Sequence, residues 1–140
     1  MRIRDESSSF VIDIAPMPEI SRYSFAVTAS IDNRVVSMDS LATLDYDSFL
    51  DDLQNLVAGV GKEACLRATY DFLLRFSSAG PQPADVDVSF YVAEYLRMPH
   101  RGVGDFGRLA LSGAFTIDPD VVAHLWTEFS EMFPPDSTPN

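Results

Sequence analysis

The sequence predicts an α+β domain, in which an antiparallel sheet of five to seven strands carries two helices packed on one face. Apolar residues alternate at every second position in several segments, and they recur at helical spacing in two others. The chain has 140 residues, of which 46% are hydrophobic, enough for one buried core. We expect a single domain over residues 1–140, frayed at about 1–8 and 135–140, where the sequence is polar or proline-rich.

The first part of the chain predicts three strands. Residues 10–14 and 23–31 alternate apolar and polar side chains, and Asp32 and Asn33 then favour a tight hairpin turn into a returning strand at 35–38. Pro16 and Pro18 end the first of these strands.

The spacing of apolar residues changes at residues 45–61, where it becomes helical and predicts an amphipathic helix. Asp45 is expected to cap its N-terminus by accepting backbone N–H bonds, and Gly59 or Gly61 to end it. The helix face opposite the apolar stripe carries Asp47, Asp51 and Asp52. We therefore expect this face to be acidic and exposed to solvent.

Alternation returns in the second half of the chain. Residues 64–78 predict one long strand or two in line, and 86–92 form a hairpin with it across the wide AGPQPA turn. A further strand is expected at 108–117, where Gly113 suggests a bulge. The last element is a helix that begins with Asp118 as N-cap and Pro119 at its first position, and ends before Pro134.

Charge and cysteine content limit the possible functions. The net charge is −11, which argues against nucleic acid as a partner because phosphates would be repelled. An acidic surface can steer a basic protein toward itself, although negative charge also keeps a protein soluble. Cys65 is the only cysteine, and we find neither a signal peptide nor an apolar run that would span a membrane. A cytoplasmic location is expected.

The stretch GVGDFG at residues 102–107 matches the dinucleotide-binding pattern G-x-G-x-x-G. That motif works when a helix follows the glycines and aims its N-terminal amides at phosphate. Here the glycines precede a segment with strand periodicity, so we interpret residues 98–107 as a connection between antiparallel strands.

Other reactive side chains offer no catalytic or metal-binding arrangement. His100 has no partner at a catalytic spacing, and Cys65 lies in a strand pattern that predicts packing. Three D-x-D pairs are explained as helix caps or as outward positions on a strand; they are Asp45/Asp47, Asp85/Asp87 and Asp118/Asp120. The expectation is a protein that is not an enzyme and has no cofactor or metal.

Three segments in order resemble a known family: YDSFLDDLQNLVAGVGKEACL, DVDVSFYV and LSGAFTIDPDVVAHLWTEFSEMF. This arrangement, over roughly residues 40 to 133, is similar to small bacterial immunity proteins associated with WapI-type and contact-dependent growth-inhibition toxins. The resemblance implies a cytoplasmic inhibitor that binds a cognate toxin domain, often a basic nuclease. The family shares no catalytic residues, so no position is carried over from it.

The acids on solvent faces are the candidate partner-binding residues: Asp47, Asp51, Asp52, Asp85 and Asp87. Two alternatives remain open. A small-ligand-binding or regulatory domain would place a pocket between sheet and helices, and a hydrolase would use His100 or Cys65. The sequence leaves the oligomeric state undetermined.

Overall fold

The structure, a computed structural model, describes residues 1–69, 71–78, 85–97 and 106–133. Its strands are β1 (Arg2–Arg4), β2 (Phe10–Pro16), β3 (Ser24–Ile31), β4 (Arg34–Ala42), β5 (Glu63–Ala68), β6 (Phe72–Ser78), β7 (Val86–Arg97) and β8 (Phe106–Ile117). Its helices are α1 (Tyr46–Val57) and α2 (Pro119–Met132). The α+β class and both predicted helices are confirmed.

The strands form two sheets, so the prediction of one sheet with five to seven strands is wrong. Sheet A has the order β1-β2-β3-β4 and sheet B the order β5-β6-β7-β8, and all pairs are antiparallel. In each sheet every strand pairs with its neighbour in sequence. Because α1 separates β4 from β5, the pairing is interrupted there and the chain makes two separate meanders.

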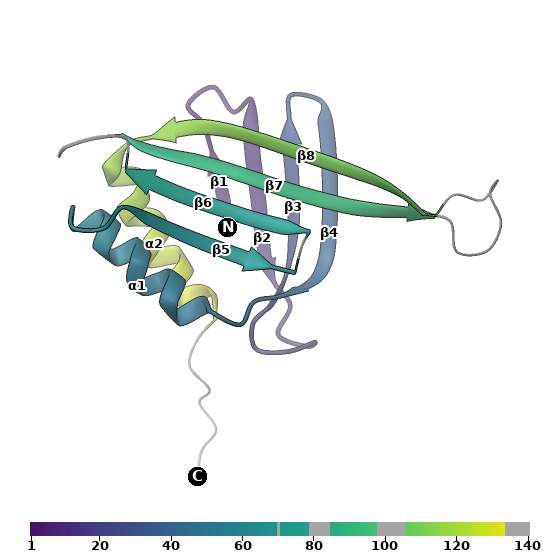
Figure 1. Cartoon of the computed structure of the whole chain (residues 1–140), viewed down its shortest axis with the longest axis horizontal. Coiled ribbons are helices and arrows are strands. Elements are labelled where there is room, and N and C mark those ends of the chain that lie inside the picture. Colours follow the sequence, from purple (N-terminus) through teal and green to yellow (C-terminus); the bar gives the residue numbers. More distant parts are fainter. Residues whose placement is uncertain (70, 79–84, 98–105, 134–140) are drawn as a thin grey trace, which may run out of the picture.

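The two sheets and the helices share one core. Sheet A crosses β7 and β8 steeply and covers one face of sheet B (Figure 1). Helix α1 lies alongside β5, and α2 packs against α1. Sheet B therefore has one face in the core, which bears Leu74, Phe76 and Val88, and one face in solvent. Such steep crossing is a standard way of packing two twisted sheets.

A hairpin replaces the long strand, or two strands in line, predicted over residues 64–78. Residues Ala68 and Phe72 are paired, and the turn between them contains Thr69 with a positive φ of 52°. A three-residue turn keeps buried residues at even positions on both strands. Alternation consequently continues through the turn and conceals it.

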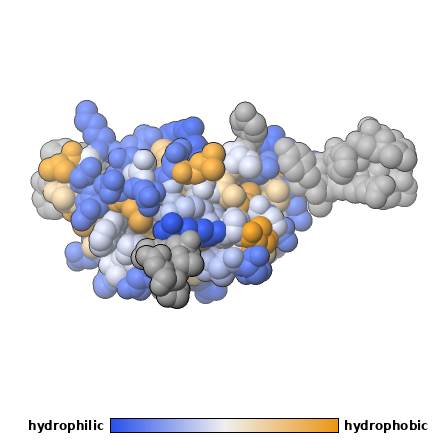
Figure 2. All heavy atoms as spheres, turned by 90° about the horizontal axis from the view of Figure 1, so that it is seen from below, coloured by the Kyte–Doolittle hydropathy of each residue, from blue (hydrophilic) through white to orange (hydrophobic). Residues whose placement is uncertain are grey.

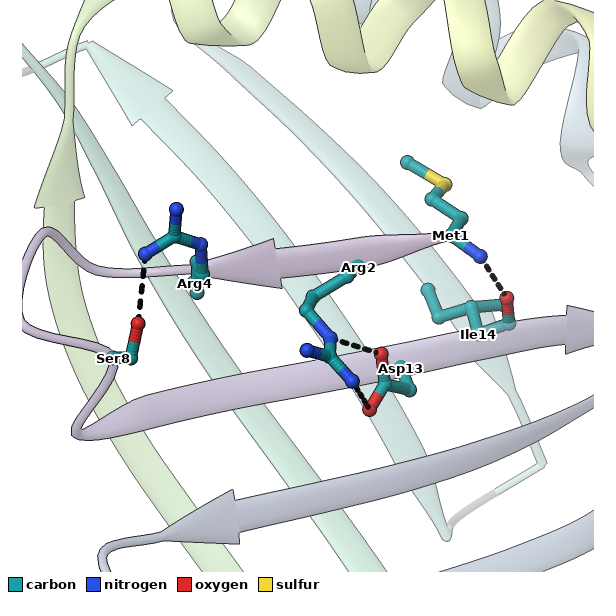
Figure 3. A network of polar contacts seen from close by, with 6 residues as sticks. All are labelled: Met1, Arg2, Arg4, Ser8, Asp13 and Ile14. Carbon is teal, nitrogen blue, oxygen red and sulfur yellow. Dashed lines mark hydrogen bonds and ion pairs between the residues drawn. The ribbon is translucent and has the colours of Figure 1, made fainter.

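The N-terminal segment, where fraying was expected at about 1–8, contains the short strand β1 paired with β2. The Met1 amino nitrogen donates to the Ile14 carbonyl at 2.9 Å, and Arg2 pairs with Asp13 at 2.8 Å (Figure 3). A three-residue strand is too short for alternation to reveal it. The expected fraying at 135–140 concerns residues outside the described part of the chain.

Gly113 does not mark a bulge, because the pairing of β7 with β8 runs without a register shift. A Cβ atom at this position would lie 2.8 Å from the Phe10 ring and 2.9 Å from the Phe90 ring. Glycine is therefore required where sheet A crosses β8, to let an aromatic ring approach the backbone.

Both helices begin as predicted. Asp45 and Asp118 occupy the N-cap positions, and Pro119 begins α2, but neither aspartate side chain makes a capping hydrogen bond. After α1, Gly59 has a φ of 80°, the left-handed conformation typical of a helix C-terminus.

Candidate protein-binding surface

Aromatic contacts hold the two helices together and against sheet B. The rings of Phe49 and Phe129 lie 4.9 Å apart at 85°, and Phe129 also contacts Phe76 on β6. The Tyr46 hydroxyl donates to the Phe129 carbonyl oxygen, and burial raises the pKa of the Tyr46 phenol. Trp126 Nε1 donates to the Leu50 carbonyl oxygen at 3.1 Å. These contacts fix the relative positions of α1 and α2.

The exposed side of this helix pair is acidic. Neither helix contains a Lys or Arg residue, and every acid on them or at their N-caps is exposed. We call this set the acidic helical face; it comprises Asp45, Asp47, Asp51, Asp52, Asp118, Asp120, Glu128 and Glu131. Hydrophilic residues cover most of the molecule where it is seen from below, with apolar residues in small separate groups (Figure 2).

Several of these acids lie where helix electrostatics disfavours them. Glu128 and Glu131 are near the C-terminus of α2, where the helix dipole favours cations. Asp47 and Asp51 are four residues apart on α1, so their like charges repel. Arg2 pairs with Asp13 and Arg75 with Glu63, and neither pair involves the acidic helical face. The dipole favours Asp45, Asp47, Asp118 and Asp120 at the helix N-termini, but it does not account for Glu128 and Glu131.

A groove of about 670 Å³ adjoins the acidic helical face. It lies between the first half of α1, the β4–α1 connection and β5, and its lining includes Asp45, Asp52, Glu63 and Arg67. At its margin Leu44 is 96% exposed. Because Glu63 is paired with Arg75, the carboxylates of Asp45 and Asp52 remain against the guanidinium of Arg67. The balance is still negative, so the groove suits a basic side chain better than an apolar small molecule.

The structure separates the five candidate residues predicted from the sequence. Asp47, Asp51 and Asp52 are exposed on α1 as predicted, and Asp52 lines the groove. Asp85 lines a different hollow, and Asp87 projects from the solvent face of sheet B, where it is paired with Ser77 and Thr116. The two hollows have no lining residue in common.

Sequence reasoning missed Glu63 and the acids of α2 as parts of this surface. Glu63 reaches the groove because β5 lies alongside α1, a contact that no local pattern reveals. The α2 acids could have been found from one signal, the complete absence of Lys and Arg from both helices.

Cys65 lines the same groove but is a poor nucleophile. Its thiol donates to Glu63 Oε1 at 3.1 Å, and the pKa of the thiol is raised, first by partial burial and then by this carboxylate. A raised pKa lowers the fraction of reactive thiolate at neutral pH. The geometry therefore gives no support to the hydrolase alternative at Cys65.

We expect Cys65 in the folded chain to react with iodoacetamide at pH 8 about tenfold more slowly than in urea-unfolded chain. Thiolate formation is suppressed in the fold, so the rate should rise only at higher pH than for an ordinary thiol. Mass spectrometry of quenched samples measures the rate. A Cys65→Ser/Ser37→Cys variant, with its thiol on an exposed strand position, serves as control. Equal rates in folded and unfolded chain would contradict the assigned pKa shift.

The remaining motifs give no further site within the described residues. The residues after Gly107 form a strand, as predicted, so the glycine pattern lacks the helix that a dinucleotide site requires. His100 and most of that loop lie outside the described residues. Among the residues described, no three His, Cys, Asp or Glu side chains are grouped to hold a metal ion. No helix in that part of the chain has the length and apolar character needed to cross a membrane.

The chain has no significant match among protein-family models, curated proteins or solved structures.

Proposed function

We propose that this chain is a non-catalytic cytoplasmic immunity protein that binds and neutralises a basic toxin domain through its acidic helical face. The observation that carries the proposal is the placement of exposed acids on both helices without a single Lys or Arg between them. Because several of these acids oppose the helix dipole or each other, they cost stability unless a cationic partner neutralises them.

Rigidity of the helix pair supports a binding role. The contacts among Phe49, Phe76 and Phe129 lie in the core, so the carboxylates are presented from a fixed frame. A preorganised surface loses less conformational entropy on association than a mobile one. Electrostatic complementarity also speeds the encounter with a basic partner.

The groove provides a place for specific recognition. A Lys or Arg side chain of the partner would enter beside Asp45 and Asp52, while Leu44 supplies an exposed apolar contact. A buried apolar contact beside charge pairs is the usual anatomy of a protein interface. The family resemblance of residues 40 to 133 points to the same class of partner.

Charge reversal tests which acids bind the partner. The partner is first captured from the native host with the wild-type chain, and its affinity is then measured for three variants. Asp51→Lys/Asp52→Lys is expected to weaken binding about 100-fold and to reduce its salt dependence, because attraction becomes repulsion. Asp85→Lys/Asp87→Lys tests the second predicted position. Glu19→Lys/Asp39→Lys makes the same change in net charge at exposed positions that belong to neither helix.

Neutralisation is tested separately in cells. Co-expression of the wild-type chain should restore growth to cells that produce the captured protein, and the Asp51→Lys/Asp52→Lys variant should not. If that variant binds and protects as well as wild type, the acidic helical face is not the binding surface. If the wild-type chain gives no protection, the immunity function itself is rejected.

A further inference from the structure

The groove beside α1 runs along an edge of sheet B. Sheet B ends at β5, and within the described residues no strand pairs with the outer side of β5. Alternate residues of this strand, from Glu63 to Arg67, line one wall of the groove, and Asp45, Ser48 and Asp52 line the other. An edge strand whose outer side adjoins a groove is a template to which another strand can be added.

The outer side of β5 presents backbone donors and acceptors to the groove. The Ser78 N–H group donates to the Lys62 carbonyl oxygen at 3.0 Å, and the antiparallel register continues from there through β5. Residues of an antiparallel strand alternate between those that exchange both bonds with the partner strand and those that exchange none. The even-numbered residues of β5 therefore bond to β6, while Glu63, Cys65 and Arg67 direct their N–H and C=O groups away from it.

The space between α1 and β5 is closed at one end and open at the other. At the closed end the N–H groups of Val60 and Gly61 both donate to the Asn55 carbonyl oxygen at 3.0 Å, which holds the end of α1 close to the start of β5. The groove is lined by the first half of α1 instead. In Figure 1 the helix and the strand run in opposite directions and diverge toward the end of β5. An added segment can therefore enter from the end near the β4–α1 connection.

The helical wall of the groove favours basic side chains. Asp45 and Asp52 are exposed there, and they lie two helical turns apart on the flank of α1 that adjoins β5. That spacing is about 10 Å along a helix, and alternate residues of a strand are about 7 Å apart. Two basic residues at alternate positions of an added strand can therefore each approach one carboxylate.

Strand β5 determines which residues lie between these two basic ones. Directly opposed residues of paired strands project on the same face of a sheet. Residues paired with Cys65 and Arg67 would thus project on the solvent face, beside the Arg67 guanidinium, and the residues between them toward α1. Because Arg67 repels a further cation on its own face, the favoured segment alternates basic with uncharged residues.

We propose that the groove takes an extended basic segment of the partner protein, which pairs antiparallel with β5 and becomes a fifth strand of sheet B. Antiparallel pairing continues the pattern of this sheet, in which all three existing pairs are antiparallel. Main-chain hydrogen bonds supply affinity in such strand addition, and alternate side chains supply specificity. The identity of the partner rests on the proposed function, to which this pairing adds the position and backbone conformation of the bound segment.

A peptide probe tests the pairing without the toxin. The peptide Ac-Lys-Val-Lys-Val-Lys-NH2 is titrated into the full chain, and binding is followed by NMR of the backbone amides. We expect a dissociation constant below about 1 mM. Hydrogen exchange of the Cys65 and Arg67 amides should slow at least about tenfold in the complex, because they gain acceptors. The same peptide with glutamate in place of lysine should not bind.

N-methylation of the peptide identifies the backbone contact. Methyl groups on the two valine nitrogens remove the N–H groups that would face β5, and they should weaken binding at least about tenfold. Methyl groups on the nitrogens of the second and third lysines, which would face away from β5, should weaken binding less than about threefold. The two modified peptides have the same charge and the same number of methyl groups, so each controls for the other.

Proline at position 67 makes the matching change in the chain. It removes an N–H group that points away from β6, so the pairing of β5 with β6 is retained. Arg67→Pro should bind both the peptide and the partner captured from the host at least about tenfold less tightly than Arg67→Ala, which loses the same side chain but keeps the N–H group. Circular dichroism checks that both variants fold; if Arg67→Pro does not, amide exchange in the wild-type complex decides.

The strand and the function fail on different results. The strand is rejected if methylation of valine and of lysine weakens binding equally, if the glutamate peptide binds as well, or if a folded Arg67→Pro binds as tightly as Arg67→Ala. Loss of binding in Asp51→Lys/Asp52→Lys with no loss in Arg67→Pro would keep the acidic helical face as the interface and reject the strand. If the wild-type chain gives no protection in cells, the immunity function is rejected, and the peptide experiments still decide whether β5 takes a basic strand.

Discussion

A Phe129→Ala variant is expected to lose about 4 kcal/mol of unfolding free energy, the middle of the range for removing a buried aromatic ring. The Phe129 side chain is 0% exposed and contacts Phe49 on α1 and Phe76 on β6. Truncation leaves a cavity where both helices meet sheet B, and the surrounding aromatic rings cannot all move to fill it. Urea denaturation monitored by circular dichroism measures the loss.

Two controls isolate the cavity effect. Phe129→Leu keeps most of the apolar volume and should cost less than half as much as alanine. Val121→Ala, on the same helix but 41% exposed, should change stability by no more than about 0.5 kcal/mol. A loss below about 1 kcal/mol for Phe129→Ala would mean that α2 is not anchored by this ring. If the proposed function holds, a stable variant with displaced helices should also bind the captured partner less tightly, because the acidic helical face would no longer be fixed.

Gly113→Ala is expected to destabilise the chain by about 2 kcal/mol, the usual cost of overpacking a well-filled core. Alanine in place of glycine normally stabilises a strand, because glycine loses more backbone entropy on folding. Here the added Cβ would approach the rings of Phe10 and Phe90 to within 2.9 Å or less. The steric cost exceeds the entropic gain, so the sign of the effect is reversed.

A double-mutant cycle identifies the ring responsible. In a Phe10→Leu background the ring next to position 113 is gone, so the same Gly113→Ala change should cost at least about 0.5 kcal/mol less. Ser112→Ala, the adjacent exposed position, should be nearly neutral. Thermal unfolding of the four chains gives the coupling. A stabilising Gly113→Ala change would show that sheet A does not pack tightly against β8 at Gly113.

Local patterns predicted the elements well and their partners poorly. Alternation identified the strands at 10–14, 23–31 and 86–92, and helical spacing identified α1 and α2. The β5–β6 hairpin was missed because the three-residue turn between Ala68 and Phe72 keeps the alternation in phase. The strand β1 was missed because three residues are too few to form a pattern.

The candidate binding residues show the same difference between what a local pattern predicts and what the fold decides. Helical spacing placed Asp47, Asp51 and Asp52 on the solvent side of α1, where they are exposed. The same reasoning grouped them with Asp85 and Asp87, which lie elsewhere because β7 starts at a different part of the fold. Residue spacing within one element cannot say which other elements lie beside it.

The amino-acid sequence by itself determined where most of the strands and both helices lie, which face of each is apolar, and that both helices carry acids without Lys or Arg. The tertiary structure decided that the strands divide into two sheets and that α1 lies alongside β5 to form the groove. The physical reason is the separation along the chain of the residues that make each kind of contact. Periodicity depends on residues a few positions apart, whereas sheet pairing and helix packing depend on contacts between residues distant in the chain, such as Tyr46 with Phe129.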